Sequence, residues 1–111
     1  MSEKYLNKII EVTVDRPLGT KHPKYDLIYP ANYGYIKGTL SGDGEELDAY
    51  ILDVKSPLVK FTGRVIAIIR RLNEDDDKLI VVEDGKNFND EQIRKLTYFQ
   101  EKYFDSIILR K

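Results

Sequence analysis

Alternating apolar and polar side chains predict short strands in the first half of the chain. Ile9–Asp15 follows this alternation, which is typical of a strand with one buried face. Arg16–Gly19 contains proline and glycine and predicts a turn, and a loop is expected over 19–27. Further extended segments are expected at three positions: Leu27–Tyr29, Tyr33–Lys37 and Leu47–Val54.

Longer apolar runs and charged turns mark the second half of the chain. Arg64–Arg70 is apolar between its two arginines and does not alternate. This pattern predicts a strand buried on both faces, or a barrel strand covered by a helix. The polar turn Asn73–Asp77 precedes a predicted strand at Lys78–Val82, and a last strand is expected at Ser106–Arg110.

One amphipathic helix is predicted near the C-terminus. Asn89 can cap its first turn, with Gln92 completing a capping box three residues later. Its apolar face is expected to carry Ile93, Leu96, Phe99 and Tyr103. The predicted fold is therefore mainly β with one C-terminal helix, a small OB-like barrel of five to six strands.

Composition excludes several classes of site. The chain has 111 residues, of which 41% are hydrophobic, so one core and a single domain over residues 1–111 are expected. It has no cysteine for thiolate metal sites, and its one histidine, His22, cannot form a multi-histidine zinc site. The net charge of −1 argues against nucleic-acid and membrane partners. No targeting signal or long apolar span is present, so the expected location is the cytoplasm.

The strongest candidate for a metal site is the acidic loop Asp43-Gly44-Glu45-Glu46-Leu47-Asp48. It holds four carboxylates within six residues, and hard oxygen ligands on a tight turn suit Mg²⁺, Mn²⁺ or Ca²⁺. Crowded carboxylates also raise one another's pKa unless a cation neutralises them. Taken alone, however, the loop is better explained as a solvated turn.

Two further groups of polar residues flank this loop in the sequence. Asp76 and Lys78 project to one face if strand geometry begins near Asp76, which suits a site for both metal and phosphate. An exposed acidic turn explains the same charges. The aromatic segment Tyr29–Tyr35 carries hydroxyls and the Asn32 amide, which could donate to phosphate oxygens or simply pack at the barrel rim.

The stretch Tyr29–Asp48 resembles the soluble, Mg²⁺-dependent inorganic pyrophosphatases. Their signature is an Asp-Gly-Asp-Pro-apolar-Asp element a short, fixed distance after a Tyr-Pro-x-Asn-Tyr-Gly element. The resemblance implies a five-stranded OB-type barrel with flanking helices and Mg²⁺ as cofactor, with Mn²⁺ as a substitute. It also implies site residues in three roles: metal binding by Asp43, Asp48 and Asp76, proton acceptance from the attacking water by Glu45, and phosphate binding by Arg16, Tyr33, Lys78 and Tyr103.

This sequence departs from the family pattern at several positions. Glu45 replaces an aspartate, Glu46 replaces a proline, and Phe104 stands where the family usually has a lysine. An N-terminal hairpin that carries a metal-linked glutamate and a phosphate-binding lysine is missing. These departures remove phosphate-binding charge that the family normally has.

Hydrolysis of pyrophosphate by a metal-activated water is the leading expectation. The alternatives are hydrolysis of another phosphoanhydride such as a nucleotide, and binding of metal or phosphate without turnover. An OB-type nucleic-acid-binding module is disfavoured by the near-neutral charge and the acidic loop. The sequence leaves the oligomeric state open, a homo-oligomer included.

Overall fold

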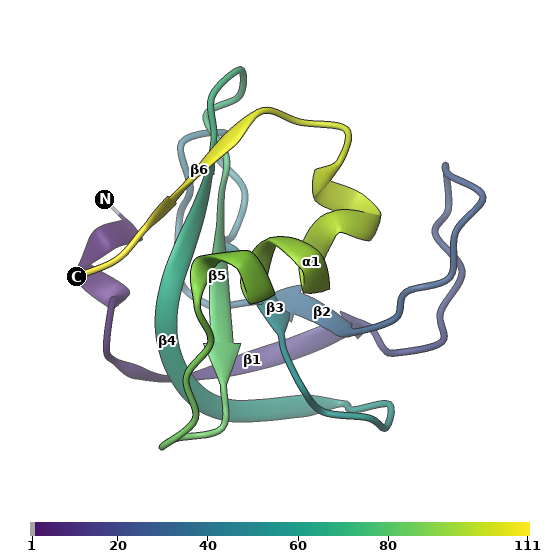
Figure 1. The fold of residues 1–111 in the computed structure, drawn as a ribbon, viewed down its shortest axis with the longest axis horizontal. Helices are drawn as coiled ribbons and strands as arrows, with labels where there is room; N and C mark the ends of the chain where they lie inside the picture. Colours follow the sequence, from purple (N-terminus) through teal and green to yellow (C-terminus); the bar gives the residue numbers. More distant parts are fainter. Residues whose placement is uncertain (1) are drawn as a thin grey trace.

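Five strands close into a barrel, and one helix lies across one side of it (Figure 1). The computed structural model describes residues 2–111. The elements follow in this order: the 3-10 helix η1 (Ser2–Tyr5), β1 (Ile9–Arg16), β2 (Asn32–Tyr35), β3 (Asp48–Ile51), β4 (Lys60–Arg71), β5 (Asp77–Val82), α1 (Asp90–Glu101) and β6 (Ser106–Leu109).

The strand order β1-β2-β3-β5-β4 closes because β1 also pairs with β4. All pairs are antiparallel except β3 with β5, which run parallel. The long strand β4 pairs with β1 through its first residues and with β6 through its last. The predicted OB-like barrel of five to six strands is therefore confirmed, with β6 as the sixth strand.

Side-chain alternation in the barrel strands divides the core into two parts. Inward residues such as Ala49, Ile51, Leu79 and Val81 fill the barrel. Their outward neighbours on the same strands form a second cluster that includes Ile93 of α1. Because β4 contributes to both clusters, the run Arg64–Arg70 needs no alternation, as the sequence predicted for a barrel strand covered by a helix.

The helix begins where the sequence predicted, and Ile93 and Phe99 of the predicted apolar face pack on the barrel, but the rest of that face does not. Asn89 caps the helix and forms the full capping box with Gln92. Ile93 is buried, but Leu96 is 36% exposed and Tyr103, which follows the end of the helix, is 49% exposed. The remaining buried helix positions are polar, namely Thr97, Gln100 and Glu101. The predicted apolar face was wrong in part because Gln100 and Glu101 find partners on the barrel, while the Thr97 hydroxyl donates to the Ile93 carbonyl within the helix.

Some strand limits also differ from the prediction. β4 begins at Lys60, four residues before the predicted start, and β3 ends at Ile51. Leu27–Tyr29 is not a strand, although Lys21 and Ile28 form an isolated bridge. None of the described helices has the length and apolar character required to cross a membrane.

Candidate active site

A cluster of charged and phenolic side chains lies where β2, β3 and β5 meet. Asp48 and Lys78 are direct partners on the parallel β3–β5 ladder, so their side chains share one face. The Lys78 Nζ lies 2.6 Å from Asp48 Oδ2 and 2.9 Å from Asp76 Oδ2. The Tyr33 hydroxyl donates to the same Asp48 oxygen at 3.0 Å. The sequence-predicted pair Asp76 and Lys78 is therefore joined by Asp48 and Tyr33.

The charges in this cluster stabilise one another. Burial alone would lower the pKa of Lys78, but the neighbouring Tyr33, Asp48 and Asp76 outweigh it and raise that pKa. Burial raises the pKa of Tyr33, so its hydroxyl keeps its proton and acts as a donor. Burial also raises the pKa of Asp76, against the opposing effect of Lys78 and Arg71. The ammonium of Lys78 thus remains charged between two carboxylates.

A cavity of about 290 Å³ opens beside this cluster. Its walls include four of the predicted site residues: Arg16, Tyr33, Asp48 and Lys78. Within residues 2–111, no hydrogen bond or ion pair engages the Arg16 guanidinium. The cavity therefore presents one free guanidinium and one lysine ammonium, which has a third N–H beyond the two directed at carboxylates.

Asp15 is a carboxylate of this cavity that sequence reasoning did not assign. The β1–β2 register shifts between Val14 and Arg16, and this irregularity leaves Asp15 outside the ladder. Asp15 lines the cavity and also a neighbouring one of about 210 Å³. Partial burial raises the pKa of Asp15, with Arg16 opposing the rise. Bulges cannot be read from strand periodicity, which explains why this residue was missed.

The carboxylates of the acidic loop lie in different surroundings. Asp43 accepts hydrogen bonds from the Ser41 hydroxyl and the Glu45 amide, and these bonds lower the pKa of Asp43. Glu45 and Glu46 line the smaller cavity together with Asp15, Tyr35 and Asp48. Glu45 is thus brought together with Asp48, whereas the Asp43 carboxylate is held by its own loop.

The predicted metal ligands do not surround one point. Among residues 2–111, no three His, Cys, Asp or Glu side chains converge closely enough to hold a metal ion. Asp48 and Asp76 share the Lys78 ammonium instead. The smaller cavity nevertheless offers carboxylate oxygens from Asp15, Glu45 and Asp48, which are the ligands that hard divalent cations prefer. The donor chemistry, though not a finished coordination sphere, fits such an ion.

Tyr103 lies away from the cavity, and its neighbour Phe104 lies in it. Tyr103 stacks on Tyr25 with ring centroids 4.8 Å apart and planes inclined by 12°. Phe104 lines the cavity, and the Arg71 guanidinium lies over its ring at 3.6 Å. A cation therefore lies against Phe104, at the sequence position where the family usually has a lysine.

A buried polar network connects α1 to this cluster, and the sequence did not predict it. The Arg71 guanidinium donates to both Glu101 oxygens, at 3.1 and 2.7 Å, and also reaches Asp76 at 3.4 Å. The Tyr50 hydroxyl donates to Glu101 and accepts from Gln100. Gln100 and Glu101 at buried helix positions were the only sequence signal of this network.

Asn32 has a structural role rather than the phosphate contact considered from the sequence. Its side chain is fully buried, and its oxygen accepts from the Leu18 and Leu58 amides, both at 3.0 Å. Its amide nitrogen donates to the Ser56 carbonyl. Three loop backbone groups therefore form hydrogen bonds with the Asn32 side chain, which leaves it unavailable to a phosphate. Tyr29 is likewise occupied, because its hydroxyl donates to Gln100.

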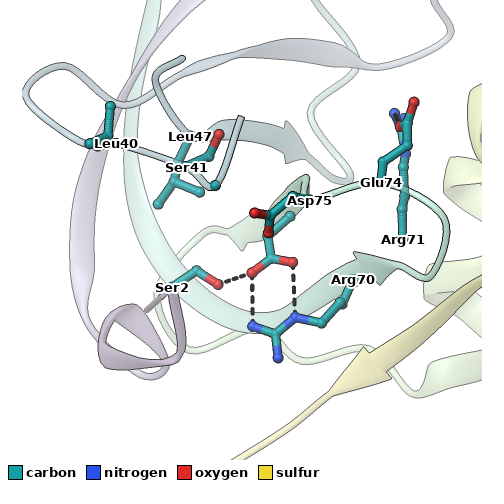
Figure 2. Close-up of a pocket in the computed structure, with 10 residues that line it drawn as sticks. Ser2, Leu40, Ser41, Leu47, Arg70, Arg71, Glu74 and Asp75 are labelled. Atoms are coloured by element: carbon teal, nitrogen blue, oxygen red, sulfur yellow. Dashed lines mark hydrogen bonds and ion pairs between the residues drawn. The ribbon is translucent and has the colours of Figure 1, made fainter. Parts of the chain in front are cut away.

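A separate cavity of about 320 Å³ lies behind the acidic loop (Figure 2). Figure 2 shows Asp75 pointing toward Ser41, with Arg70 and Ser2 below. Both Arg70 and the Ser2 hydroxyl bond Asp77, and Arg70 also bonds Glu3. These contacts fasten η1 to β4 and β5, so Ser2, Arg70 and Asp77 at this cavity already have partners.

Comparison with known proteins agrees with this geometry. The family model described as inorganic pyrophosphatase matches residues 5–108. The inorganic pyrophosphatase of Corynebacterium glutamicum is 34% identical over 101 residues, covering 72% of this chain and 63% of that protein. That of Bacillus sp. strain PS3 is 30% identical over 133 residues, covering 89% of this chain and 78% of that protein.

Solved structures give the same fold. The inorganic pyrophosphatase from Ehrlichia chaffeensis superposes with a TM-score of 0.72 at 17% identity, covering 95% of this chain and 87% of that chain. The one from Neisseria gonorrhoeae gives 0.62 at 26% identity, over 86% and 73% of the two chains.

The barrel, the site and these matches define a chain of the inorganic pyrophosphatase family. The match with the Corynebacterium glutamicum relative spans 63% of that protein's length. The alignment of this chain with the Bacillus relative covers 133 positions, more than this chain has residues, so that relative carries internal segments absent here.

Proposed function

We propose that this chain hydrolyses inorganic pyrophosphate to two phosphates, with Mg²⁺ as its cofactor and Mn²⁺ as a substitute. The observation that carries the proposal is the joining of Asp48, Asp76, Lys78 and Tyr33 in one hydrogen-bonded cluster beside the free Arg16. Carboxylates and cations around a single cavity suit a substrate that combines several negative charges with a divalent metal.

The substrate would be bound by cationic and phenolic donors. Arg16 has a guanidinium free to bind two phosphate oxygens, and the third N–H of Lys78 is available for another. Tyr33 keeps its proton and can shift its hydrogen bond from Asp48 to a phosphate oxygen. Positive charge fixed in the cavity before the reaction stabilises the charge that develops on the phosphate leaving group.

The carboxylates would bind the metal and accept the proton of the attacking water. Asp43, Asp48 and Asp76 are the residues we propose as metal ligands, with Asp15 as an additional candidate. A bound divalent cation supplies an activated water and neutralises charge on phosphate oxygens. Glu45 is the proposed general base, because its carboxylate borders the cavity that Asp48 also lines. Its side chain is one methylene longer than the aspartate of the family pattern, so it reaches farther from the loop.

The direct test is phosphate release from pyrophosphate with Mg²⁺, with Mn²⁺ and with EDTA. We expect release that depends on the metal and is lost with EDTA. Asp48→Asn removes a proposed ligand while preserving side-chain size, and we expect a loss of at least about a hundredfold in kcat.

Two results would count against the proposal. Absence of phosphate release at every metal concentration would refute pyrophosphatase activity. If Mg²⁺ then still raised the Tm, the chain would be a metal-binding homologue without turnover. Unchanged turnover in Asp48→Asn would refute the metal assignment alone.

A further inference from the structure

The segment between β1 and β2 forms a small hairpin with a defined backbone. The Gly19 amide donates to the Tyr29 carbonyl, and the Tyr29 amide donates to the Thr20 carbonyl, both at 2.8 Å. The His22 amide donates to the Leu27 carbonyl at 2.9 Å. Figure 1 shows this hairpin projecting from the barrel on the side where α1 ends. Hydrogen bonds between the two arms of the hairpin therefore hold the backbone of His22 in place.

The imidazole ring of His22 is fixed as well. Its Nδ1 accepts hydrogen bonds from the Lys24 and Tyr25 amides, at 2.9 and 3.1 Å. The ring lies parallel to that of Tyr29, inclined by 4° with centroids 5.7 Å apart. Tyr29 itself is buried and anchored on Gln100 at 2.7 Å. Backbone bonds at one edge and a stacked phenol on one face define the ring orientation.

These contacts also determine which ring nitrogen carries the proton. An Nδ1 that accepts two hydrogen bonds has no proton, so the proton of the neutral ring is on Nε2. Partial burial and the positive charges of Arg16 and Lys24 lower the pKa of His22, which favours the neutral ring. Within residues 2–111, Nε2 has no protein acceptor. The ring thus carries one unused N–H donor.

This ring belongs to the wall of the candidate active site. His22 lines the 290 Å³ cavity together with Arg16 and Lys78. Tyr25 lines it too, and its stack on Tyr103 connects the hairpin to the segment after α1. The exposed Lys21 and Lys24 of the same hairpin are not among the described residues that line the cavity. His22 therefore places the fixed imidazole of the hairpin in the same cavity wall as Arg16.

We propose that His22 is a phosphate-binding residue of this site and donates its Nε2–H to a substrate or product phosphate oxygen. This proposal rests on the pyrophosphatase function proposed above and adds a neutral donor to the two cations. A neutral imidazole next to Arg16 adds a directional contact without further charge repulsion between donors. The proposed His22 contact recognises the phosphate group and no other part of a phosphoanhydride.

Two substitutions separate the two edges of the ring. His22→Asn retains an acceptor near the position of Nδ1 and removes the donor at Nε2. His22→Gln reaches the position of Nε2 with an amide N–H but lacks a matched Nδ1. Lys21→Gln is the control, since it lies on the same hairpin, is exposed and leaves the cavity wall unchanged.

The binding measurement uses imidodiphosphate, the non-hydrolysable analogue of pyrophosphate, in isothermal titration calorimetry with Mg²⁺. We expect His22→Asn to weaken binding about tenfold or more, as for a lost hydrogen bond to a charged group, and His22→Gln to retain more affinity. Lys21→Gln should bind as the parent chain does. Equal affinity of His22→Asn and the parent chain, or equal weakening by Lys21→Gln, overturns the proposal.

A second readout does not depend on turnover. In ¹⁵N spectra of the His22 ring, inorganic phosphate should shift Nε2 and leave Nδ1 as an unprotonated nitrogen. A ring that does not respond at phosphate concentrations that shift Lys78 Nζ overturns the proposal. Failure of pyrophosphate hydrolysis with intact phosphate binding would instead refute the proposed function and leave the His22 contact in place.

Discussion

Replacing Glu101 with glutamine removes one charge from a buried ion pair without changing side-chain size. The Arg71 and Glu101 side chains are only 7% and 5% exposed, and two hydrogen bonds join them. Removing one partner leaves the other charge buried without compensation, which costs about 3–5 kcal/mol. Arg71 retains weaker contacts with Asp76 and Glu74, so we expect the lower end, about 3 kcal/mol.

Such a loss is large for this chain. Domains of this size have a free energy of unfolding of about 5–15 kcal/mol. Urea unfolding followed by far-UV circular dichroism measures the change directly. With m of about 1.5 kcal/mol per molar urea, the midpoint should fall by about 2 M with m unchanged.

An exposed ion pair provides the matched control. Arg64 and Asp84 are 2.8 Å apart, close to the 2.7 Å of Arg71 and Glu101, but their side chains are 36% and 62% exposed. Asp84→Asn should therefore leave the free energy of unfolding nearly unchanged, because solvent screens an exposed ion pair. If Glu101→Gln changed it no more than Asp84→Asn does, the reasoning from burial would be refuted. The double variant Arg71→Met with Glu101→Leu should recover part of the loss, because it removes both buried charges.

Three further predictions concern the barrel and the loops beside it. Gly34→Ala should destabilise the chain by at least about 2 kcal/mol in urea unfolding, because a Cβ there would overlap the Thr13 backbone on β1. An unchanged free energy of unfolding would mean that the β1–β2 contact is looser than described. Asn32→Ala leaves three backbone groups unpaired and should lower the free energy of unfolding by about 3 kcal/mol, visible as a fall in Tm. An unchanged Tm would refute the structural role of Asn32. Burial alone would raise the pKa of Asp77, but hydrogen bonds from Arg70 and Ser2 lower it below its usual value. The Asp77 carboxylate therefore stabilises the folded chain above about pH 4, and this stabilisation is lost as the pH falls further. Asp77→Asn should therefore flatten the acid side of the stability profile, and an equally steep profile would contradict the assignment.

The regular parts of this fold could be predicted from local patterns. Alternation located β1, the apolar run located the middle of β4, and Asn89 with Gln92 located the start of α1. These features depend on neighbouring residues only, so a single sequence contains them. The ends of strands depend on pairing partners, which explains why β4 extends back to Lys60.

Residues whose environment is created by distant segments could not be predicted. Arg71 and Glu101 read as surface charges in the sequence, and they are buried only because β4 and α1 bring them together. Asp15 enters the site through a strand irregularity, and His22 through a hairpin that local propensity describes as a loop. Tyr103 stacks on Tyr25 instead of lining the cavity, a contact between two distant segments that no local pattern marked.

The parallel pairing of Asp48 with Lys78 links the site to the order of folding. These two residues are 30 positions apart, and the whole of β4 lies between them in the sequence. Parallel pairs joined through long connections form slowly, because the entropy of loop closure is lost before any contact compensates for it. A partly folded chain can therefore hold its antiparallel hairpins and still lack the contact between these two side chains. The candidate site therefore depends on the one parallel pairing of the barrel, so the phosphate binding proposed above would also report that β3 and β5 have paired.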